Sequence, residues 1–333
     1  MDHLRYLTSH YDEKIRRIRE IDAPLNFVFI TDQHNRLNHG VTIREKLINQ
    51  PYELAANHIA SIQYVLDRCP GISFVVSGGD IGNDYDHDPA AIRASHQEVM
   101  DALYSLSVPV HCVVGNHDDA IGVASDRGVH NVPFAILPDE MHRLCMKNNP
   151  TPENYYYFDA PQQPFRFVFL NSSDRPYHLD ENGEYPFNWR LEISNRQAEW
   201  VEQEALATDR KIIVFSHAPL HNDGIFGTGG GPDFVKPYDD TLNAPRVYYA
   251  LKTCKNVVAL IHGHVHYDNL LYRDDMVTVT TLCSLVQEWA PGCPKREYGS
   301  VTETAFDVFS IKDNVMHITR FGAGCDRVAV LMR

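Results

Sequence analysis

The sequence predicts an α/β fold made of two packed sheets with helices outside them. In the first third of the chain, apolar β-branched segments alternate with segments whose apolar residues have helical spacing. This order is typical of parallel strands joined by crossover helices. The second half holds more strand-like segments, some of them paired across short turns. Ligand-type residues follow several of these strands, at the sheet edge where α/β proteins bind ligands.

The first half is expected to supply a parallel sheet. A charged helix is predicted over residues 9–22, before the first strand. Asp88 and Pro89 fit the cap and first turn of a helix that runs to about Ser105. A helix is also expected over Pro51–Arg68, with the proline in its first turn. The three strands are predicted over 26–31, 73–77 and 108–114.

The second half is expected to form hairpins and a second sheet. Ser194–Gln197 fits a capping box that starts a helix reaching about Ala207, and a further helix is predicted over 245–254. The strands are predicted over 154–158, 165–170, 211–215, 257–261, 276–282, 305–311 and 315–319. No linker, charge block or repeat divides the chain, so residues 1–333 are expected to form one domain.

Composition limits the classes of function. The chain has 44 acidic and 30 basic residues, a formal net charge of −14. This balance argues against non-specific binding of nucleic acid, which requires a basic surface. The first residues do not resemble a signal peptide, and no apolar run approaches the ~18 residues of a membrane span. Seven dispersed cysteines without a Cys-x-x-Cys pair indicate reduced, mostly buried thiols and a cytoplasmic protein.

Seven residues at predicted strand ends form a candidate binuclear metal site. Carboxylate, amide and imidazole groups together suit Mn²⁺, Fe²⁺, Zn²⁺ or Co²⁺. The seven are Asp32, His34, Asp80, Asn116, His217, His264 and His266. An extended backbone would place the two side chains of each Asp-x-His or His-x-His pair on one side. Asp80 is the natural bridging ligand, since a carboxylate has two oxygens, and the glycines before three of these residues permit close turns.

Each motif alone has an ordinary structural explanation. A lone Asp-x-His is common on surfaces, a Gly-Asp is usually a turn, and a buried histidine is often a satisfied core residue. The chain has 18 histidines, so chance pairs are expected. The ordered combination, with each member at a strand end, is what favours a site.

Five motif blocks resemble those of the calcineurin-like metallophosphoesterases. They are Asp32-Gln33-His34, Gly79-Asp80, Gly115-Asn116-His117-Asp118, Ser216-His217 and Gly263-His264-Val265-His266. The resemblance implies a four-layer α/β/β/α sandwich of two mixed sheets. It implies that Asp32, His34 and His266 hold one ion, that Asn116, His217 and His264 hold the other, and that Asp80 bridges them. His117 falls at the family's catalytic histidine, and the implied mechanism is in-line attack by a hydroxide between the metals.

One position departs from the family pattern. Several members have an aspartate three residues after the bridging aspartate, where it orients the catalytic histidine. Asn83 stands at that position here and Asp84 follows it, so the resemblance leaves open which of them orients His117. His221 is either a loop histidine in solvent or a substrate contact. The segment Arg320–Arg327 is interpreted first as structural support.

These observations predict a metal-dependent phosphatase or phosphodiesterase that acts on a small soluble phosphoester. A nuclease is the nearest alternative and would require a basic groove. A non-catalytic metal-binding scaffold is the alternative of a different class, in which ligands or the catalytic histidine would be lost. All eight residues are present in this chain.

Overall fold

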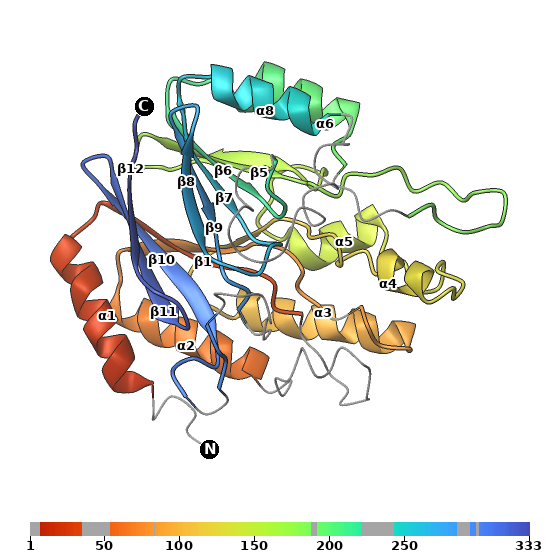
Figure 1. The fold of residues 1–333 in the computed structure, drawn as a ribbon, viewed down its shortest axis with the longest axis horizontal. Helices are drawn as coiled ribbons and strands as arrows, with labels where there is room; N and C mark the ends of the chain where they lie inside the picture. Colours follow the sequence, from red (N-terminus) through yellow and green to blue (C-terminus); the bar gives the residue numbers. More distant parts are fainter. Residues whose placement is uncertain are drawn as a thin grey trace.

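Two six-stranded mixed sheets pack face to face between two layers of helices (Figure 1). This computed structural model describes residues 7–34, 54–82, 84–187, 192–220, 243–284, 294–297 and 300–333. Helices α1, α2 and α3 cover one sheet, and α6 and α8 cover the other. The predicted four-layer α/β/β/α sandwich is therefore confirmed.

The first sheet has the strand order β12-β11-β10-β1-β2-β3. Its strands are β1 Leu25–Ile30, β2 Ile72–Ser77, β3 Val110–Cys112, β10 Ala305–Lys312, β11 Val315–Gly322 and β12 Arg327–Val330. The strands β1, β2 and β3 are parallel, as predicted from their crossover helices. The predicted C-terminal hairpin is confirmed, and it joins the sheet where β10 pairs antiparallel with β1.

The second sheet has the order β4-β5-β6-β7-β9-β8. Its strands are β4 Tyr156–Asp159, β5 Phe165–Leu170, β6 Lys211–Ser216, β7 Val257–His262, β8 Asn269–Arg273 and β9 Met276–Thr280. The four inner strands are parallel, and the edge strands β4 and β8 are antiparallel to their neighbours. Parallel pairing brings the ends of β6 and β7 to one edge of this sheet.

The predicted helices form, and their starts agree best where a capping residue next to the helix marks them. The helices that the structure describes are α1 Thr8–Ile21, α2 Leu54–Arg68, α3 Pro89–Tyr104, α4 Ile121–Asp126, α5 Pro138–Cys145, α6 Asn195–Trp200 and α8 Ala244–Thr253. The side chain of Asp88 caps α3 by accepting a hydrogen bond of 2.9 Å from the backbone N–H of Ala90. Helices α4 and α5 and strands β8 and β12 were not predicted, and β3 is shorter than expected.

Only one of the two hydrogen bonds of the capping box predicted at α6 is present. Ser194 Oγ accepts a hydrogen bond of 3.1 Å from the backbone N–H of Gln197, as expected. The side chain of Gln197 does not return that bond. Its amide instead pairs with the backbone of Asn171, and Asp174 binds the backbone N–H of Ser194. A buried loop after β5 therefore competes successfully for the glutamine.

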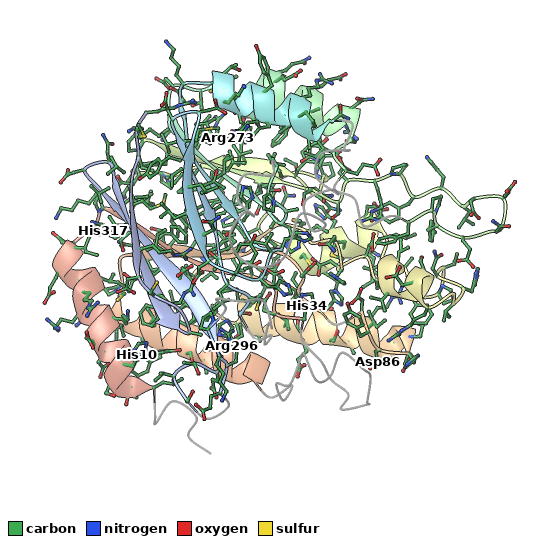
Figure 2. The ribbon with its side chains drawn as sticks, in the orientation of Figure 1. His10, His34, Asp86, Arg273, Arg296 and His317 are labelled. Atoms are coloured by element: carbon green, nitrogen blue, oxygen red, sulfur yellow. The ribbon has the colours of Figure 1, made fainter. Side chains whose placement is uncertain are left out.

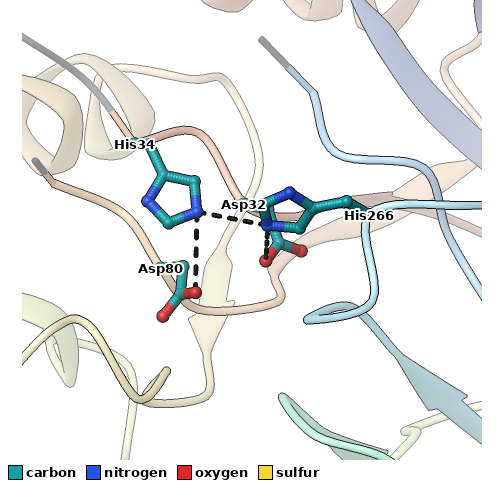
Figure 3. Close-up of side chains that lie close together, drawn as sticks. All are labelled: Asp32, His34, Asp80 and His266. Atoms are coloured by element: carbon teal, nitrogen blue, oxygen red, sulfur yellow. Dashed lines mark hydrogen bonds and ion pairs between the residues drawn. The ribbon is translucent and has the colours of Figure 1, made fainter. Parts of the chain in front are cut away.

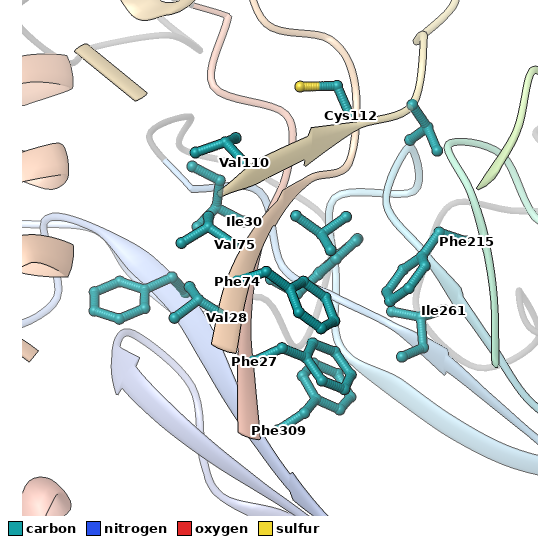
Figure 4. Close-up of a cluster of buried hydrophobic side chains, with 14 of the residues drawn as sticks. Phe27, Val28, Ile30, Phe74, Val75, Val110, Cys112, Phe215, Ile261 and Phe309 are labelled. Atoms are coloured by element: carbon teal, nitrogen blue, oxygen red, sulfur yellow. The ribbon is translucent and has the colours of Figure 1, made fainter. Parts of the chain in front are cut away.

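The space between the sheets is filled by aromatic rings (Figure 4). Phe27 of β1 stacks on Phe74 and Phe309, with ring centroids 5.2 and 5.0 Å away. Its ring also meets the edge of Phe215, from β6 of the opposite sheet, at 5.7 Å. All four side chains are buried. Close packing of large rings resists displacement of one sheet against the other, so the strand ends that bear the site are held in place.

The cysteine and membrane expectations can be compared with the described residues. Their six cysteines are free thiols, and four of them are buried; Cys293 lies outside the described residues. No helix in the described ranges has the length and apolar character needed to cross a bilayer. The single-domain organisation and the cytoplasmic location stay predictions.

Candidate metal centre

The candidate ligands converge at the carboxyl ends of strands from both sheets. Asp32 follows β1 and Asp80 follows β2, whereas His217 and His264 follow β6 and β7 in the other sheet. Figure 2 shows His34, just beyond the end of β1, in the interior of the view. The segments that precede these residues are buried strands, so the apolar sequence before each motif determines where its polar residue emerges.

The first group of candidate ligands consists of Asp32, His34, Asp80 and His266 (Figure 3). His34 Nε2 lies 3.3 Å from His266 Nε2 and 3.6 Å from Asp80 Oδ2. His266 Nε2 lies 3.1 Å from Asp32 Oδ1. His34 and His266 are 232 positions apart in the sequence, so only the packing of the two sheets brings them together.

The second group consists of Asp80, His217 and His264. His217 Nε2 lies 3.2 Å from Asp80 Oδ2 and 3.2 Å from His264 Nδ1. The amide oxygen of Asn116 lies 3.1 Å from the same Nε2 atom, so Asn116 belongs to this group by position. The other nitrogen of His217 binds the carbonyl oxygen of Gly78 at 2.7 Å, which fixes the ring. Asp80 is common to both groups.

The two groups have the spacing expected for ligands of a metal ion. Atoms bound at ~2.1 Å to one ion lie roughly 3.0–3.5 Å from each other, close to the separations seen here. Burial lowers the pKa of His34 to about 4 and that of His264 to about 3, which favours the neutral imidazole that metals bind. The residues present therefore fit a pair of cations.

The electrostatics of the centre also favour positive charge. Burial alone would raise the pKa of Asp32, but nearby imidazoles outweigh burial and hold it at about 2. The pKa of Asp80 lies well below its usual range for the same reasons. Burial opposes protonation of His217, yet Asp80 and Asp32 raise its pKa to about 9. The carboxylates therefore stabilise a cationic group between them.

The backbone at the centre is strained. Asp32, His34, Asp80, His264 and His266 all have left-handed backbone conformations, with φ of 53°, 45°, 52°, 68° and 59°. For residues other than glycine this conformation costs ~1–2 kcal/mol. The backbone at the two paired motifs is therefore not extended, so the arrangement that an extended backbone would give does not apply here. His264 and His266 lie in different groups of ligand atoms.

Two glycines permit the close approach of the loops. Gly79 has φ of +92°, and a Cβ at this position would lie 2.7 Å from the backbone nitrogen of Gly115. A Cβ at Gly115 would lie 2.1 Å from Asp80 Oδ1. Any side chain at either position would push the two loops apart. The expectation that these glycines bring backbone close to the site is confirmed.

Asp118 connects these same loops and received no role from the sequence. Its buried carboxylate accepts hydrogen bonds from the backbone N–H groups of Asp80, Ile81 and Gly115, at 3.0, 2.7 and 2.7 Å. The sequence signal for a role of Asp118 was its position next to His117. The three N–H donors come from two loops that only the fold places together. Asp118 therefore holds the backbone on which the candidate bridging carboxylate stands.

His117 lies beside the centre and is held by Asp84. Its Nδ1 lies 2.8 Å from Asp84 Oδ2, and Asp84 is buried. Burial opposes protonation of His117, but the carboxylates of Asp84 and Asp80 outweigh it and raise its pKa to about 9. Of the two residues that the resemblance left open, Asp84 is the one whose contact with this ring lies within the described residues. Asn83 and His221 lie outside the described residues.

Asp84→Asn is expected to lower kcat while metal content stays near wild type. The amide can still contact Nδ1, but it removes the charge that favours the protonated ring. We expect a loss of roughly tenfold or more, smaller than the ~10²–10⁴-fold of a missing general acid. Steady-state rates and elemental analysis of the same preparation test this. An unchanged kcat would show that Asp84 does not act through His117.

The sequence model described as "Calcineurin-like phosphoesterase" matches residues 25–268 of this chain. The matched region contains every candidate ligand. The chain belongs to the calcineurin-like phosphoesterase family.

Two further likenesses place this calcineurin-like phosphoesterase among known proteins. A zebrafish (Danio rerio) protein named manganese-dependent ADP-ribose/CDP-alcohol diphosphatase is 22% identical over 236 residues, which cover 59% of this chain and 67% of the relative. The crystal structure of a dimetal phosphatase from Danio rerio superposes with a TM-score of 0.63 at 19% identity, over 93% of this chain and 100% of that one.

A second solved structure shares the architecture. It is described as GAP50, the anchor in the inner membrane complex of Plasmodium, and it superposes with a TM-score of 0.50 at 15% identity over 93% of this chain and 89% of that one. At such identities the two structures show the fold alone. The family and its relatives support metal-dependent hydrolysis of phosphoesters.

Proposed function

We propose that this protein hydrolyses a small soluble phosphoester with a pair of divalent metal ions. One observation carries the proposal: two groups of ligand atoms share Asp80, and His117 with its partner Asp84 stands beside them. A single structural metal would need neither the second group nor an adjacent, carboxylate-bound histidine.

The proposed ligands divide as the geometry groups them. Asp32, His34 and His266 would hold one ion. Asn116, His217 and His264 would hold the other, and Asp80 would contact both. Bound there, the two ions would activate a water molecule and stabilise negative charge on the phosphoryl oxygens.

His117 is the proposed general acid. Asp84 accepts from its Nδ1 and fixes the plane of the ring, so Nε2 would carry the proton for the leaving oxygen. The N–H of the His117 backbone also donates to Asp80 Oδ1 at 2.9 Å. The same residue therefore ties the reacting ring to the bridging carboxylate, which fixes their relative position.

The substrate proposed first for testing is a nucleotide with a diphosphate linkage. The support is the name of the zebrafish relative, a diphosphatase that acts on ADP-ribose and CDP-alcohols. Manganese is proposed as the metal on the same ground and on the mixed oxygen and nitrogen ligand set. The net charge of −14 favours such small substrates over nucleic acid polymers.

A substrate panel tests the proposal. Protein stripped of metal by a chelator is expected to be inactive, and addition of Mn²⁺ is expected to restore hydrolysis of at least one panel member. The panel comprises a bis-aryl phosphodiester, an aryl phosphomonoester, a cyclic nucleotide, ADP-ribose and single-stranded DNA. Elemental analysis of the reloaded protein is expected to give close to two ions per chain.

The outcomes separate the alternatives. Preferred cleavage of DNA would favour a nuclease. Binding of two ions without turnover of any ester would favour the non-catalytic scaffold. Full activity in the stripped protein would refute metal-dependent hydrolysis.

A further inference from the structure

A cluster of four charged side chains, two of them buried and two partly buried, adjoins the turn that carries His264 and His266. We call it the arginine clamp, and it consists of Asp268, Asp307, Arg320 and Arg327. Asp268 is the last residue matched by the family's sequence model, and the other three lie beyond it. The clamp therefore joins the family region to the C-terminal strands β10, β11 and β12.

Arg320 is the centre of the clamp. Its side chain is 1% exposed, so it makes no contact with substrate. Nε and Nη2 donate to the carboxylate of Asp307 at 2.8 and 3.0 Å. Nη1 and Nη2 donate to Asp268 at 2.8 and 2.6 Å, and Nη1 also donates to the carbonyl oxygen of Ala323 at 2.7 Å. All five N–H groups of the guanidinium are used, which no other side chain could reproduce.

The remaining members balance the charge and reach the second sheet. Arg327 donates to Asp307 at 2.6 Å and to the carbonyl oxygen of Thr280, at the end of β9, at 2.7 Å. Asp268 accepts the backbone N–H of Leu282 at 2.9 Å. Two arginines oppose two aspartates, so removal of one member leaves a buried charge without its partner.

Asp268 connects the arginine clamp to the turn that carries the two candidate ligands His264 and His266. Asp268 follows His266 by two residues, and both histidines of the turn have left-handed backbones. Such conformations persist only when the surroundings hold them. Asp32 holds the beginning of the turn, since its carboxylate accepts the backbone N–H of His264 at 2.9 Å. The end of the turn is held by Asp268, and hence by Arg320.

We propose that Arg320, through Asp268, is a positioning residue for His264 and His266 and thereby sets the affinity of both metal sites. The inference rests on the proposed assignment of these histidines as ligands. The two histidines belong to different groups of ligand atoms. A loosened clamp therefore weakens the binding of both ions together. Residues outside the ligand sphere that orient metal ligands typically change metal affinity by ~10–100-fold when mutated.

The test is the dissociation constant for Mn²⁺, measured by isothermal titration calorimetry on the full chain after metal removal. Asp268→Asn and Arg320→Lys are expected to raise it by ~10–100-fold for both binding steps. Activity of these variants is expected to return as Mn²⁺ is raised, with kcat near wild type and a higher half-saturating Mn²⁺ concentration. A merely structural role would not produce recovery by metal.

Arg166→Lys is the matched control. Arg166 is also buried and pairs with one carboxylate through two hydrogen bonds, to Asp159 at 2.7 and 3.1 Å. Arg166 is the second residue of β5, which ends four residues later at Leu170. Its hydrogen bonds go to Asp159, Glu204 and Ala205, none of which belongs to the turn that carries His264 and His266. This control is expected to lower Tm and to leave Mn²⁺ affinity within about twofold.

Gly324→Ala keeps every charge and tests the geometry directly. A Cβ at this position would lie 2.4 Å from Arg320 Nη1 and 2.7 Å from Asp268 Oδ2, so the methyl group would force the pair apart. Wild-type Mn²⁺ affinity in folded Asp268→Asn and Gly324→Ala proteins would overturn the inference, whether or not Arg320→Lys folds. Failure of the wild-type protein to bind Mn²⁺ would instead refute the proposed metal centre.

Discussion

Asp80→Asn is expected to lower metal content and phosphoester hydrolysis together. Asp80 is the residue common to both ligand groups, and its carboxylate lies within 3.2 Å of His217 and 3.6 Å of His34. The asparagine side chain lacks the negative charge of Asp80, and it has one oxygen where the carboxylate has two that would contact the two cations. A loss of roughly 4 kcal/mol of transition-state stabilisation corresponds to ~10³-fold in kcat/KM.

The measurement combines elemental analysis with kinetics at fixed Mn²⁺. Asp119→Asn is a matched control, because Asp119 is also buried and lies in the neighbouring loop after β3, but is in neither ligand group. It is expected to retain both ions. Asparagine at position 80 preserves the size of the side chain and an acceptor for the backbone N–H of His117, so a folding defect is not expected. Normal hydrolysis by Asp80→Asn would refute the bridging assignment.

His117→Ala is expected to lower kcat by ~10²–10⁴-fold and leave metal content near wild type. The ring is not in either ligand group but lies next to the first, with its centroid 5.2 Å from that of His34. A general acid matters most when the leaving group is a poor one. The loss should therefore be larger for a phenyl ester than for a nitrophenyl ester.

The comparison of the two esters distinguishes the possible roles of His117. An equal loss on both would show that the ring stabilises charge on the phosphoryl group and does not donate to the leaving oxygen. Loss of metal in the variant would make His117 a ligand or a support for Asn116, and would refute its assignment as the acid.

Local sequence predicted the features that depend on short-range chemistry. Asp88 and Pro89 predicted the start of α3, and the cap is present. The apolar runs before Asp32 and Asp80 are strands, because short continuous apolar runs bounded by turn residues are typical of strands buried on both faces. Edge strand β8 was missed because none of its five residues is buried, so no strong apolar pattern marks it.

The sequence by itself determined the chemistry of this protein. It determined which carboxylates and imidazoles are present, and it placed them at strand ends, because apolar strand formation and glycine turns are local properties. The order of the motifs then predicted the family.

Only the tertiary structure decided how these groups are used. It selected Asp84 as the partner of His117 and placed His264 and His266 in different groups. It also closed the arginine clamp around Asp268. These contacts join residues far apart in the chain, and they depend on strand order, left-handed turns and the packing of two sheets. Those properties follow from the energy of the whole fold, which no short segment encodes.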